Sequence, residues 1–318
     1  MSKRSTATRI LKSLGILYGA TCIVGGIYLA EVSVRLAKAP LGDTAPQRRR
    51  FRRRYKARLE DVTLTAADGA ALHAWFIQPR RPNGKSVLIL HGIESNRLGS
   101  AEYADIFLRH GYSVLIPDSR DHGESGGEIA TYGILERHDV HLWVAWLRHR
   151  VPGCTFLLGE SMGAAIGLQA TAITPDICAA VVEAPYADFR QISYERLGRR
   201  TGTGQLFWQT LGRPILEIAF AYARIRYGVY LPDADPKAAL EHTTTPTLLI
   251  AGINDQDIPK HHAEELQQAC HGHCALWIVP GGEHADANTF AKEEFEHRVI
   301  DFFNAHAAHP NPTANLSS

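Results

Sequence analysis

Short apolar runs alternate with amphipathic segments along most of the chain. The apolar runs are nearly continuous, as is typical of strands that are buried on both faces of a sheet. These expected strands are SVLIL (86–90), YSVLIP (112–117), TFLLG (155–159), AAVVE (179–183), TLLIAG (247–252) and ALWIVP (275–280). Segments such as GILERHDVHLWVAWLRH (133–149) and KEEFEHRVIDFF (292–303) have a helical pattern between or after the strands. The alternation predicts an α/β fold, with a mostly parallel central sheet and helices on both faces.

Two further strands precede this series. DVTLTA (61–66) and ALHAWFI (71–77) flank the turn signal ADGA, so they are expected to form an antiparallel hairpin.

About sixty residues interrupt the rhythm between the strand that ends near Glu183 and the strand that begins near Thr247. They contain helical patterns and no strand pattern, and residues 204–228 are aromatic and aliphatic on most faces of a helix. A long insertion after a sheet strand usually acts as a lid or a binding element. We therefore expect a helical cap insertion at about 185–240, although an ordinary structural excursion fits the same pattern.

The first thirty residues have the pattern of a membrane anchor. Ser13 to Ala30 contain eighteen residues without a charge, and a basic segment (1–12) precedes them. This is about the minimum length of a span, since a helix crosses the hydrocarbon in roughly 20 residues. A cleaved signal peptide is less favoured because Tyr28 occupies a position that requires a small residue, and a buried core helix is the third alternative. Basic residues flank both ends, so the side of the membrane is not assigned.

Two further features of the sequence lie within or just after this span. Gly15 and Gly19 form a GxxxG pair that could pack two helices together. Residues 48–58 carry eight basic residues and no acidic one, although the chain as a whole has a net charge of only +1. Such a belt favours an anionic membrane surface over nucleic acid, and a solvated linker is the plainer alternative. Residues 31–58 are therefore expected to be a basic juxtamembrane linker.

The composition of the whole chain is that of an ordinary globular protein, with 45% hydrophobic and 21% charged residues. We expect a catalytic domain at 59–303 and a flexible tail at 304–318. The five cysteines are too few and too scattered for a disulfide framework, and they do not fix the compartment. Cys270 and Cys274, in CHGHC, could bind a metal or close a small disulfide; without a second ligand cluster, no metal is expected.

The candidate nucleophile lies where a buried strand meets a helix. Gly159-Glu160-Ser161-Met162-Gly163 has the GxSxG spacing of a nucleophile elbow in the context that this motif requires. The turn needs small residues on both sides of the serine because the helix crosses close to the strand. Ser161 is thereby expected above the carboxyl edge of the sheet, with the N–H of Met162 available to a developing negative charge.

A serine hydroxyl needs a base and an orienting acid. Asp255 follows the strand 247–252, and His284 follows the strand 275–280, so both are expected at the same sheet edge as Ser161. Asp257 is an alternative acid, and Glu183, at a strand end, is a less favoured one.

Neighbouring residues complete the candidate site. In LILHGIESNR (88–97), Gly92 allows close backbone approach, so the N–H of Ile93 is expected to be the second oxyanion donor, while His91 is expected to orient the loop. Glu136 and Asp139, on a helical segment, are expected to be ordinary surface charges.

These motifs together resemble the α/β-hydrolase superfamily. The likeness covers about residues 59–303, rests on LILHG, DSRDHGESGG, GESMGA, AGINDQDIP and GGEH, and is greatest to the branch of serine-aminopeptidase-like and monoacylglycerol-lipase-like hydrolases. By this resemblance Ser161, Asp255 and His284 match the catalytic triad, and Ile93 and Met162 match the oxyanion donors. One departure is Asp121, which stands where the family has glycine; aspartate tolerates a left-handed backbone, so we expect the turn to survive.

The sequence therefore predicts a membrane-anchored serine hydrolase that cleaves a carboxylic ester, thioester or amide and needs no cofactor. A small-molecule or lipid-like acyl substrate is expected, with no nucleic-acid partner and no assigned oligomeric state. A serine aminopeptidase is one alternative. A non-catalytic binding protein of the same fold is another, since folds host many functions. A dehalogenase does not fit, because its nucleophile is aspartate.

Overall fold

The computed structural model describes residues 3–307 of the chain, with side chains from residue 7. The described chain forms two compact units, residues 36–189 with 234–307, and residues 3–35 with 190–233. We call them the α/β unit and the helical unit. Most of the expected tail (304–318) lies outside the described residues; within them, the last helix continues to Ala305.

The α/β unit is built on an eight-stranded sheet. Its strands are β1 (Arg58–Thr65), β2 (Ala71–Gln78), β3 (Ser86–Leu90), β4 (Ser113–Pro117), β5 (Thr155–Glu160), β6 (Ile177–Glu183), β7 (Thr247–Gly252) and β8 (Cys274–Val279). The spatial order is β1-β2-β4-β3-β5-β6-β7-β8. β2 pairs antiparallel with β1 and β4, and the other strand pairs are parallel. The α/β architecture and all eight predicted strands are confirmed.

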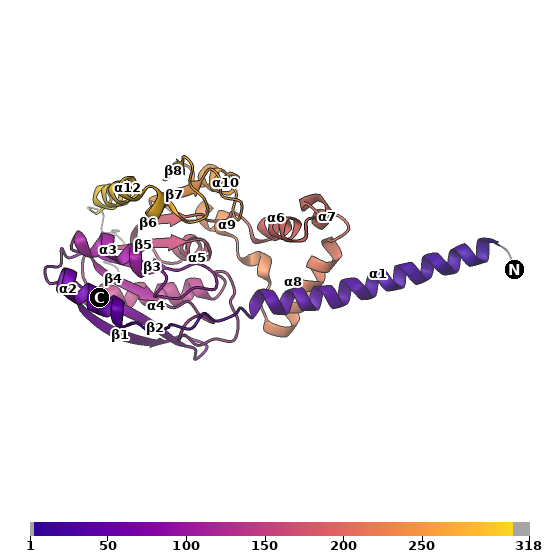
Figure 1. Ribbon diagram of the computed structural model, residues 1–318, viewed down its shortest axis with the longest axis horizontal. Helices are drawn as coiled ribbons and strands as arrows, with labels where there is room; N and C mark the ends of the chain where they lie inside the picture. The colour runs from indigo at the N-terminus through magenta and orange to yellow at the C-terminus, as the bar shows by residue number, and fades with distance from the viewer. Residues whose placement is uncertain (1–2, 308–318) are drawn as a thin grey trace. The chain divides into compact units, whose positions relative to one another are not determined.

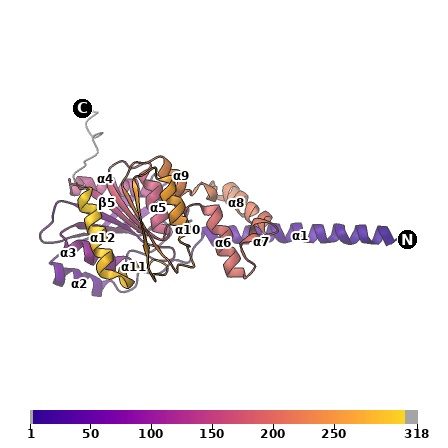
Figure 2. The same ribbon diagram turned by 90° about the horizontal axis from the view of Figure 1, so that it is seen from above.

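Helices cover both faces of this sheet, as Figure 1 and Figure 2 show. One face carries α2 (Ala45–Tyr55), α3 (Ala101–Arg109) and α12 (Lys292–Ala305), and the other carries α4 (Glu136–Arg150), α5 (Met162–Thr171), α9 (Pro236–Glu241) and α10 (His261–Ala269). A short α11 (Ala287–Phe290) precedes α12. On the first face the ring of Phe156 stacks on Phe303 at 4.4 Å, and Phe107 stacks on Phe303 at 5.8 Å. This aromatic stack ties β5 to α3 and α12.

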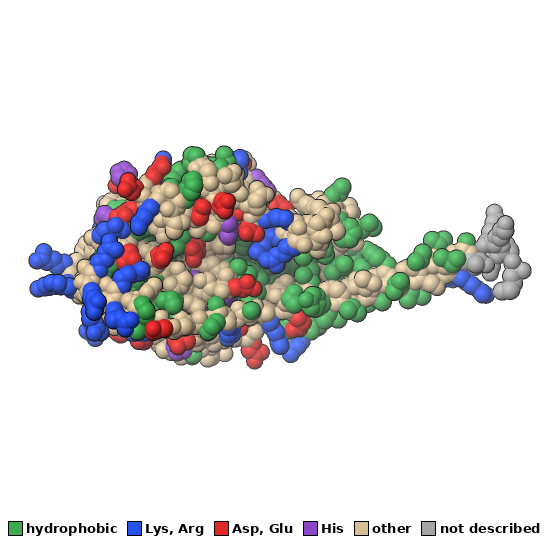
Figure 3. Space-filling view, in the orientation of Figure 1, with side chains coloured by type: hydrophobic (Ala, Val, Ile, Leu, Met, Phe, Trp, Pro, Cys, Tyr) green, Lys and Arg blue, Asp and Glu red, His purple; other side chains and the backbone are tan. Residues whose placement is uncertain are grey.

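The basic segment that we expected to be a linker contains helix α2. Its Phe51 is fully buried in the core of the α/β unit, and the hydroxyl of Tyr55 donates to the carbonyl of Asp105, 3.2 Å away. Burial of one aromatic side chain stabilises a fold by roughly 1.5–3 kcal/mol, which holds this highly charged helix in place. Most of its arginines remain on the surface, and Figure 3 shows basic side chains gathered over α2.

The first turn of α4 contradicts one expectation. Glu136 and Asp139 were expected to be surface charges, and this was wrong, because they are only 3% and 6% exposed. Glu136 accepts hydrogen bonds from the N–H groups of Thr131 and Gly133, at 2.7 and 2.8 Å. Asp139 accepts two hydrogen bonds from the guanidinium of Arg120, at 2.7 and 2.8 Å. A carboxylate can be buried where such donors replace water.

The helical unit consists of α1 (Lys3–Val34), α6 (Phe189–Thr201), α7 (Gln205–Gln209), α8 (Arg213–Tyr227) and the 3-10 turn η1 (Leu231–Asp233). The segment 204–228 is therefore two helices that meet at Gly212, where a Cβ would lie 2.8 Å from the ring of Trp208. The N-terminal expectation was a span at 13–30, and the observed helix is longer. Residues Ala7–Val34 are long and apolar enough to cross a membrane. Only 11% of the most apolar 18-residue stretch of this helix is buried, which disfavours a buried core helix.

Helix α1 lies beside α8 (Figure 1) in a defined register. A Cβ on Gly26 would lie 2.6 Å from the side chain of Ile218, whereas a Cβ on Gly15 or Gly19 would meet no described atom within 4 Å. The glycine that permits the close approach of α1 to α8 is therefore Gly26, and the GxxxG pair takes no part in this contact. At the end of the helix, Glu31 accepts hydrogen bonds from two α8 hydroxyl groups, those of Tyr222 at 2.8 Å and Tyr227 at 2.7 Å.

Four of the five cysteines form disulfides in the structure. Cys154, just before β5, pairs with Cys178 in β6, and Cys270 pairs with Cys274. Their Cα atoms are 5.8 and 5.7 Å apart, within the usual range for a disulfide. The sequence did not predict the first pair, because its partners are 24 residues apart and only the parallel pairing of β5 with β6 brings them together.

Candidate active site

Ser161 occupies the turn between β5 and α5. Its φ of 51° and ψ of −116° lie in a region that non-glycine residues rarely adopt, and its N–H donates to the carbonyl of Glu183, 2.8 Å away. A Cβ on Gly159 would lie 2.5 Å from the carbonyl oxygen of Gly163, and a Cβ on Gly163 would collide with the carbonyl of Leu90. The strand and the helix can therefore cross at this distance only with glycine at both positions.

His284 and Asp255 lie in the loops after β8 and β7, at the same edge of the sheet. His284 Nε2 is 3.0 Å from Ser161 Oγ, and His284 Nδ1 is 2.8 Å from Asp255 Oδ2. Ser161 is 7% exposed and Asp255 is 3% exposed, so both are shielded from water, whereas the side chain of His284 between them is 29% exposed. This arrangement can move a proton from the hydroxyl to an imidazole that a carboxylate orients.

The loop after β7 fixes the orientation of Asp255. Its Oδ1 accepts hydrogen bonds from the N–H groups of Asp257 and Ile258, both at 2.8 Å, which leaves Oδ2 for His284. The alternative acid, Asp257, supplies a backbone N–H to this carboxylate. Glu183, the other alternative, accepts from Tyr103 and from the backbone of Ala287 instead.

The loop after β3 runs beside the serine. A Cβ on Gly92 would lie 3.5 Å from the Cβ of Ser161, so a larger side chain there would occupy the space in front of the hydroxyl. Within the described residues, the N–H groups of Ile93 and Met162 have no hydrogen-bond acceptor. Two unpaired backbone donors that flank a nucleophile can receive the negative charge of a tetrahedral intermediate.

His91 is fully buried behind this loop. Its Nε2 accepts a hydrogen bond from the N–H of Ser119 at 3.0 Å, so Nδ1 carries the proton and donates to the carbonyl of Gly92 at 2.7 Å. Burial, and then the neighbouring His122, lower the pKa of His91 to about 3. The neutral ring therefore bridges two loops, which is an orienting position.

Asp121 has a φ of 58°, the left-handed conformation that the family's glycine would adopt easily. Its N–H donates to the carbonyl of Gly126 at 2.9 Å, and its Oδ1 lies 3.3 Å from Lys38 Nζ. The turn is therefore closed with aspartate in this position.

Two further carboxylates lie at the ends of β5 and β6: Glu160, which is partly buried, and the buried Glu183, which the sequence offered as a less favoured acid. Glu160 Oε1 accepts hydrogen bonds from the N–H of Gly92 at 3.3 Å and the hydroxyl of Ser100 at 3.0 Å. Glu183 accepts hydrogen bonds from the hydroxyl of Tyr103 at 3.0 Å and from the N–H of Ala287 at 2.8 Å. Burial raises the pKa of Glu160, and it raises the pKa of Glu183 to about 7. The sequence signal for these two carboxylates is a glutamate at the end of each of two apolar strands, β5 and β6.

Sequence comparisons connect the chain to a group of hydrolases. Residues 81–213 match the profile of the family described as "Serine aminopeptidase, S33". The uncharacterised protein YqkD of Bacillus subtilis is 30% identical over 245 residues, which cover 75% of this chain and 77% of YqkD. A thermostable monoacylglycerol lipase from a Bacillus species is 26% identical over 198 residues, 57% of this chain and 75% of that enzyme.

Structural comparison agrees with the sequence. An esterase from Pyrococcus furiosus superimposes with a TM-score of 0.69 at 22% identity, covering 86% of this chain and 98% of the esterase. An esterase from Exiguobacterium antarcticum gives a TM-score of 0.55 at 19% identity, covering 77% of this chain and all of that esterase. At these identities the likeness concerns the fold.

Proposed function

The chain belongs to the serine-aminopeptidase-like family of α/β hydrolases, and we propose that it is a serine esterase with Ser161, His284 and Asp255 as its catalytic triad. The observation that carries this proposal is the chain of two hydrogen bonds, 3.0 and 2.8 Å long, that joins the hydroxyl through the imidazole to the carboxylate. Three side chains from separate loops converge in the geometry that nucleophilic catalysis needs.

In the proposed reaction, Ser161 Oγ attacks the carbonyl carbon of an ester while its proton passes to His284 Nε2. The imidazolium, stabilised by Asp255, then gives this proton to the leaving alkoxide, and an acyl-serine remains. Water then takes the place of the serine in the second half of the reaction. His284 accepts a proton from the water molecule while its oxygen attacks the acyl carbon. His284 returns this proton to Ser161 Oγ, and a carboxylic acid is released.

The negative charge of each tetrahedral intermediate falls on the former carbonyl oxygen. We assign the N–H groups of Ile93 and Met162 as its donors because neither has an acceptor within the described residues. Met162 follows the serine in the chain, and Ile93 follows Gly92, where a Cβ would lie 3.5 Å from the Cβ of Ser161. Loss of one such donor typically reduces kcat by a factor of about 10²–10³. Both donors are main-chain groups. The N–H of Ile93 belongs to the loop after β3, which Glu160 and His91 hold through Gly92, and the N–H of Met162 begins α5.

We also propose that α1 anchors the enzyme in a membrane and that the substrate is a lipid-like ester. Exposed large apolar side chains are concentrated in the helical unit, where α1 alone exposes eleven of them between Ile10 and Val32. Figure 3 shows this apolar surface along α1. A monoacylglycerol lipase among the relatives supports an acyl substrate of this kind.

The second candidate function is an aminopeptidase, which the description of the family profile favours. An aminopeptidase needs acidic groups that bind the amino terminus of its substrate. The partly buried Glu160 and the buried Glu183 already accept hydrogen bonds from neighbouring residues, so they are poorly suited to this task.

A labelled fluorophosphonate tests the nucleophile directly. We expect the wild-type chain and Asp257→Asn to be labelled and Ser161→Ala not to be labelled. A panel of p-nitrophenyl esters and aminoacyl anilides then separates the two activities. Hydrolysis of medium-chain esters, lost in Ser161→Ala, would support the esterase; turnover of anilides without turnover of esters would replace it with the aminopeptidase, and labelling of Ser161→Ala would refute the triad.

A further inference from the structure

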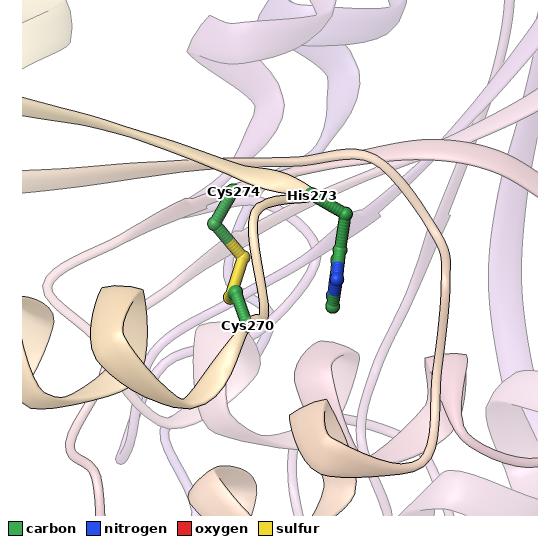
Figure 4. Close-up of side chains that lie close together, drawn as sticks. All are labelled: Cys270, His273 and Cys274. Carbon is green, nitrogen blue, oxygen red and sulfur yellow. A yellow bond between two sulfur atoms is a disulfide. The ribbon is translucent and has the colours of Figure 1, made fainter.

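The turn between α10 and β8 holds a cluster of two cysteines and a histidine. Cys270 follows the last residue of α10, Cys274 begins β8, and His273 lies between them (Figure 4). The two sulfur atoms and one ring nitrogen of His273 all lie within 4.8 Å of one another. Two thiols and an imidazole are a donor set that borderline-soft metal ions prefer.

The backbone of this turn is fixed in the shape that brings the three side chains together. His271 and Gly272 have φ values of 49° and 99°, two successive left-handed residues that reverse the chain. The N–H of His273 donates to the carbonyl of Cys270 at 3.2 Å, and the N–H of Thr247 in β7 donates to the carbonyl of His273 at 3.1 Å. The residues that carry the donor atoms are therefore held by backbone hydrogen bonds next to the edge of the sheet.

The histidine side chain supplies a second, independent observation. His273 Nε2 is buried, and among the described residues it has no hydrogen-bond partner. Buried polar atoms are nearly always paired, and one that is not calls for an explanation such as an ion. The neighbouring His271 is exposed, whereas His273 is partly buried, so only His273 is shielded from water as a metal ligand would be.

We propose that this turn is a redox-gated metal site, in which Cys270, His273 and Cys274 bind a divalent ion of the Zn²⁺ class when the disulfide is reduced. A dithiol reductant supplies two electrons and two protons, the S–S bond breaks, two thiols form, and the reductant becomes a cyclic disulfide. The ion then binds both sulfurs as thiolates and displaces their two protons. The C-x₃-C spacing lies within the range of known zinc sites.

Small movements of the side chains are enough to form this site. Tetrahedral ligands at about 2.0–2.3 Å from an ion lie roughly 3.5 Å apart. The released sulfurs must therefore separate, and the nitrogen, which is within 4.8 Å of both, needs only a small shift. In the oxidised form the sulfurs bond to each other and cannot act as thiolates, which excludes the ion. One redox event therefore exchanges a covalent link between α10 and β8 for a metal link.

The site is separate from the chemistry that we propose for Ser161. Cys274 is at the amino end of β8, whereas His284 follows its carboxyl end. A strand of this length spans roughly 20 Å. The ion would thus stabilise the sheet edge or report the redox state, without touching the substrate.

The experiment uses the full chain in detergent with Cys154→Ala and Cys178→Ala, so that the turn holds both remaining thiols outside α1. After reduction and removal of the reductant without oxygen, Co²⁺ is titrated as a spectroscopic probe and then displaced with Zn²⁺. We expect one ion per chain with a thiolate-to-cobalt charge-transfer band, and no band in the oxidised protein. His273→Ala should weaken binding by about tenfold or more, since even outer-shell changes cost 10–100-fold, while His271→Ala is the matched control.

Circular dichroism of each variant separates loss of the site from loss of the fold. Binding that needs both cysteines and His273 but not His271 supports the proposal. Reduced protein that binds Co²⁺ no more tightly than Cys270→Ser with Cys274→Ser overturns it. Equal affinity of His273→Ala and the parent also overturns it, because the pair of thiols alone would then explain the binding.

Discussion

Glu183→Gln should make the folded protein less sensitive to rising pH. Glu183 is 3% exposed beneath the candidate site, and burial raises the pKa of its carboxyl from 4.5 to about 7. Tyr103 and Ala287 donate hydrogen bonds to it, which favours the ionised form, whereas the nearby Glu160 and Asp286 oppose ionisation. Glutamine has the same shape, can still accept from the N–H of Ala287, and cannot ionise.

The size of the effect follows from the difference in pKa between the folded and unfolded chains. Between about pH 4.5 and pH 7 the folded protein keeps the Glu183 proton and the unfolded chain has lost it, so the folded state binds more protons and its stability falls as the pH rises. Each pH unit in this window costs about 1.4 kcal/mol, and the loss is complete above pH 7 at about 3 kcal/mol. For a protein of this size that corresponds to roughly 6–12 °C in Tm.

Thermal unfolding of the full chain in detergent, from pH 4.5 to pH 8, measures the loss of stability that ionisation of Glu183 causes. Other titrating groups are common to both proteins, so the difference between wild type and Glu183→Gln isolates Glu183. Tm of the glutamine variant relative to wild type should rise steadily from pH 4.5 to pH 7 and then level off. Glu293→Gln, an exposed change in α12, is the control and should follow wild type. Parallel curves for Glu183→Gln and wild type would refute the inference that a buried, protonated carboxyl lies under the site.

Three further changes test the site and the anchor. Asp255→Asn should lower kcat for a p-nitrophenyl ester by about 10⁴, and Asp257→Asn by less than about twofold; equal losses would contradict the assignment of the acid. Gly159→Ala should lower the free energy of unfolding by more than about 3 kcal/mol, measured by urea denaturation, because its Cβ has no room at the strand crossing. Gly26→Leu should loosen the contact of α1 with α8, raising amide hydrogen exchange in α8, whereas Gly19→Leu should not; equal exchange would show that α1 does not dock there.

The sequence predicted the sheet and the site loops because both depend on local patterns. Apolar runs mark buried strands, and the carboxyl ends of parallel strands meet at one edge, so Asp255 and His284 could be placed near Ser161 without coordinates. The geometry adds what the pattern does not contain. It places Asp255, with one carboxylate oxygen held by two backbone N–H groups, within 2.8 Å of His284, which is why we propose Asp255 and not Asp257 as the acid.

The errors concern residues whose environment is set by distant partners. Asp139 is buried because Arg120, from another loop, satisfies both of its oxygens. Helix α2 is part of the core because of one residue, Phe51, among six arginines. A charge or a basic run is usually solvated, and the pattern of one segment cannot reveal a partner that the fold supplies.

Backbone strain gathers at the edge of the sheet that carries the candidate site. Glu94, Ser161, Ala184 and Ala285 have φ values of 50–54°, and they follow β3, β5, β6 and β8 respectively. Left-handed backbone costs a non-glycine residue roughly 1–2 kcal/mol, and it persists only where the surroundings over-determine it. Four such residues at one edge therefore require strong local restraints.

The carboxylates of Glu160 and Glu183 are restraints of this kind, which explains why acids lie next to the site. Glu160, next to the strained serine, holds the backbone of the β3 loop through the N–H of Gly92, and Glu183 holds the β8 loop through the N–H of Ala287, three residues after His284. Glu160 thus links the β3 loop to the turn that carries Ser161. Glu183 links the loop that carries His284 to the end of β6, whose carbonyl accepts a hydrogen bond from the N–H of Ser161, so it bears on the distance between hydroxyl and imidazole. If strain at this edge is held mainly by these bonds, removing the acceptor at Glu183 should move His284 before it unfolds the sheet. Glu183→Ala should then lower kcat more than Glu183→Gln does while both proteins remain folded, and equal kcat values would assign the restraint to other contacts.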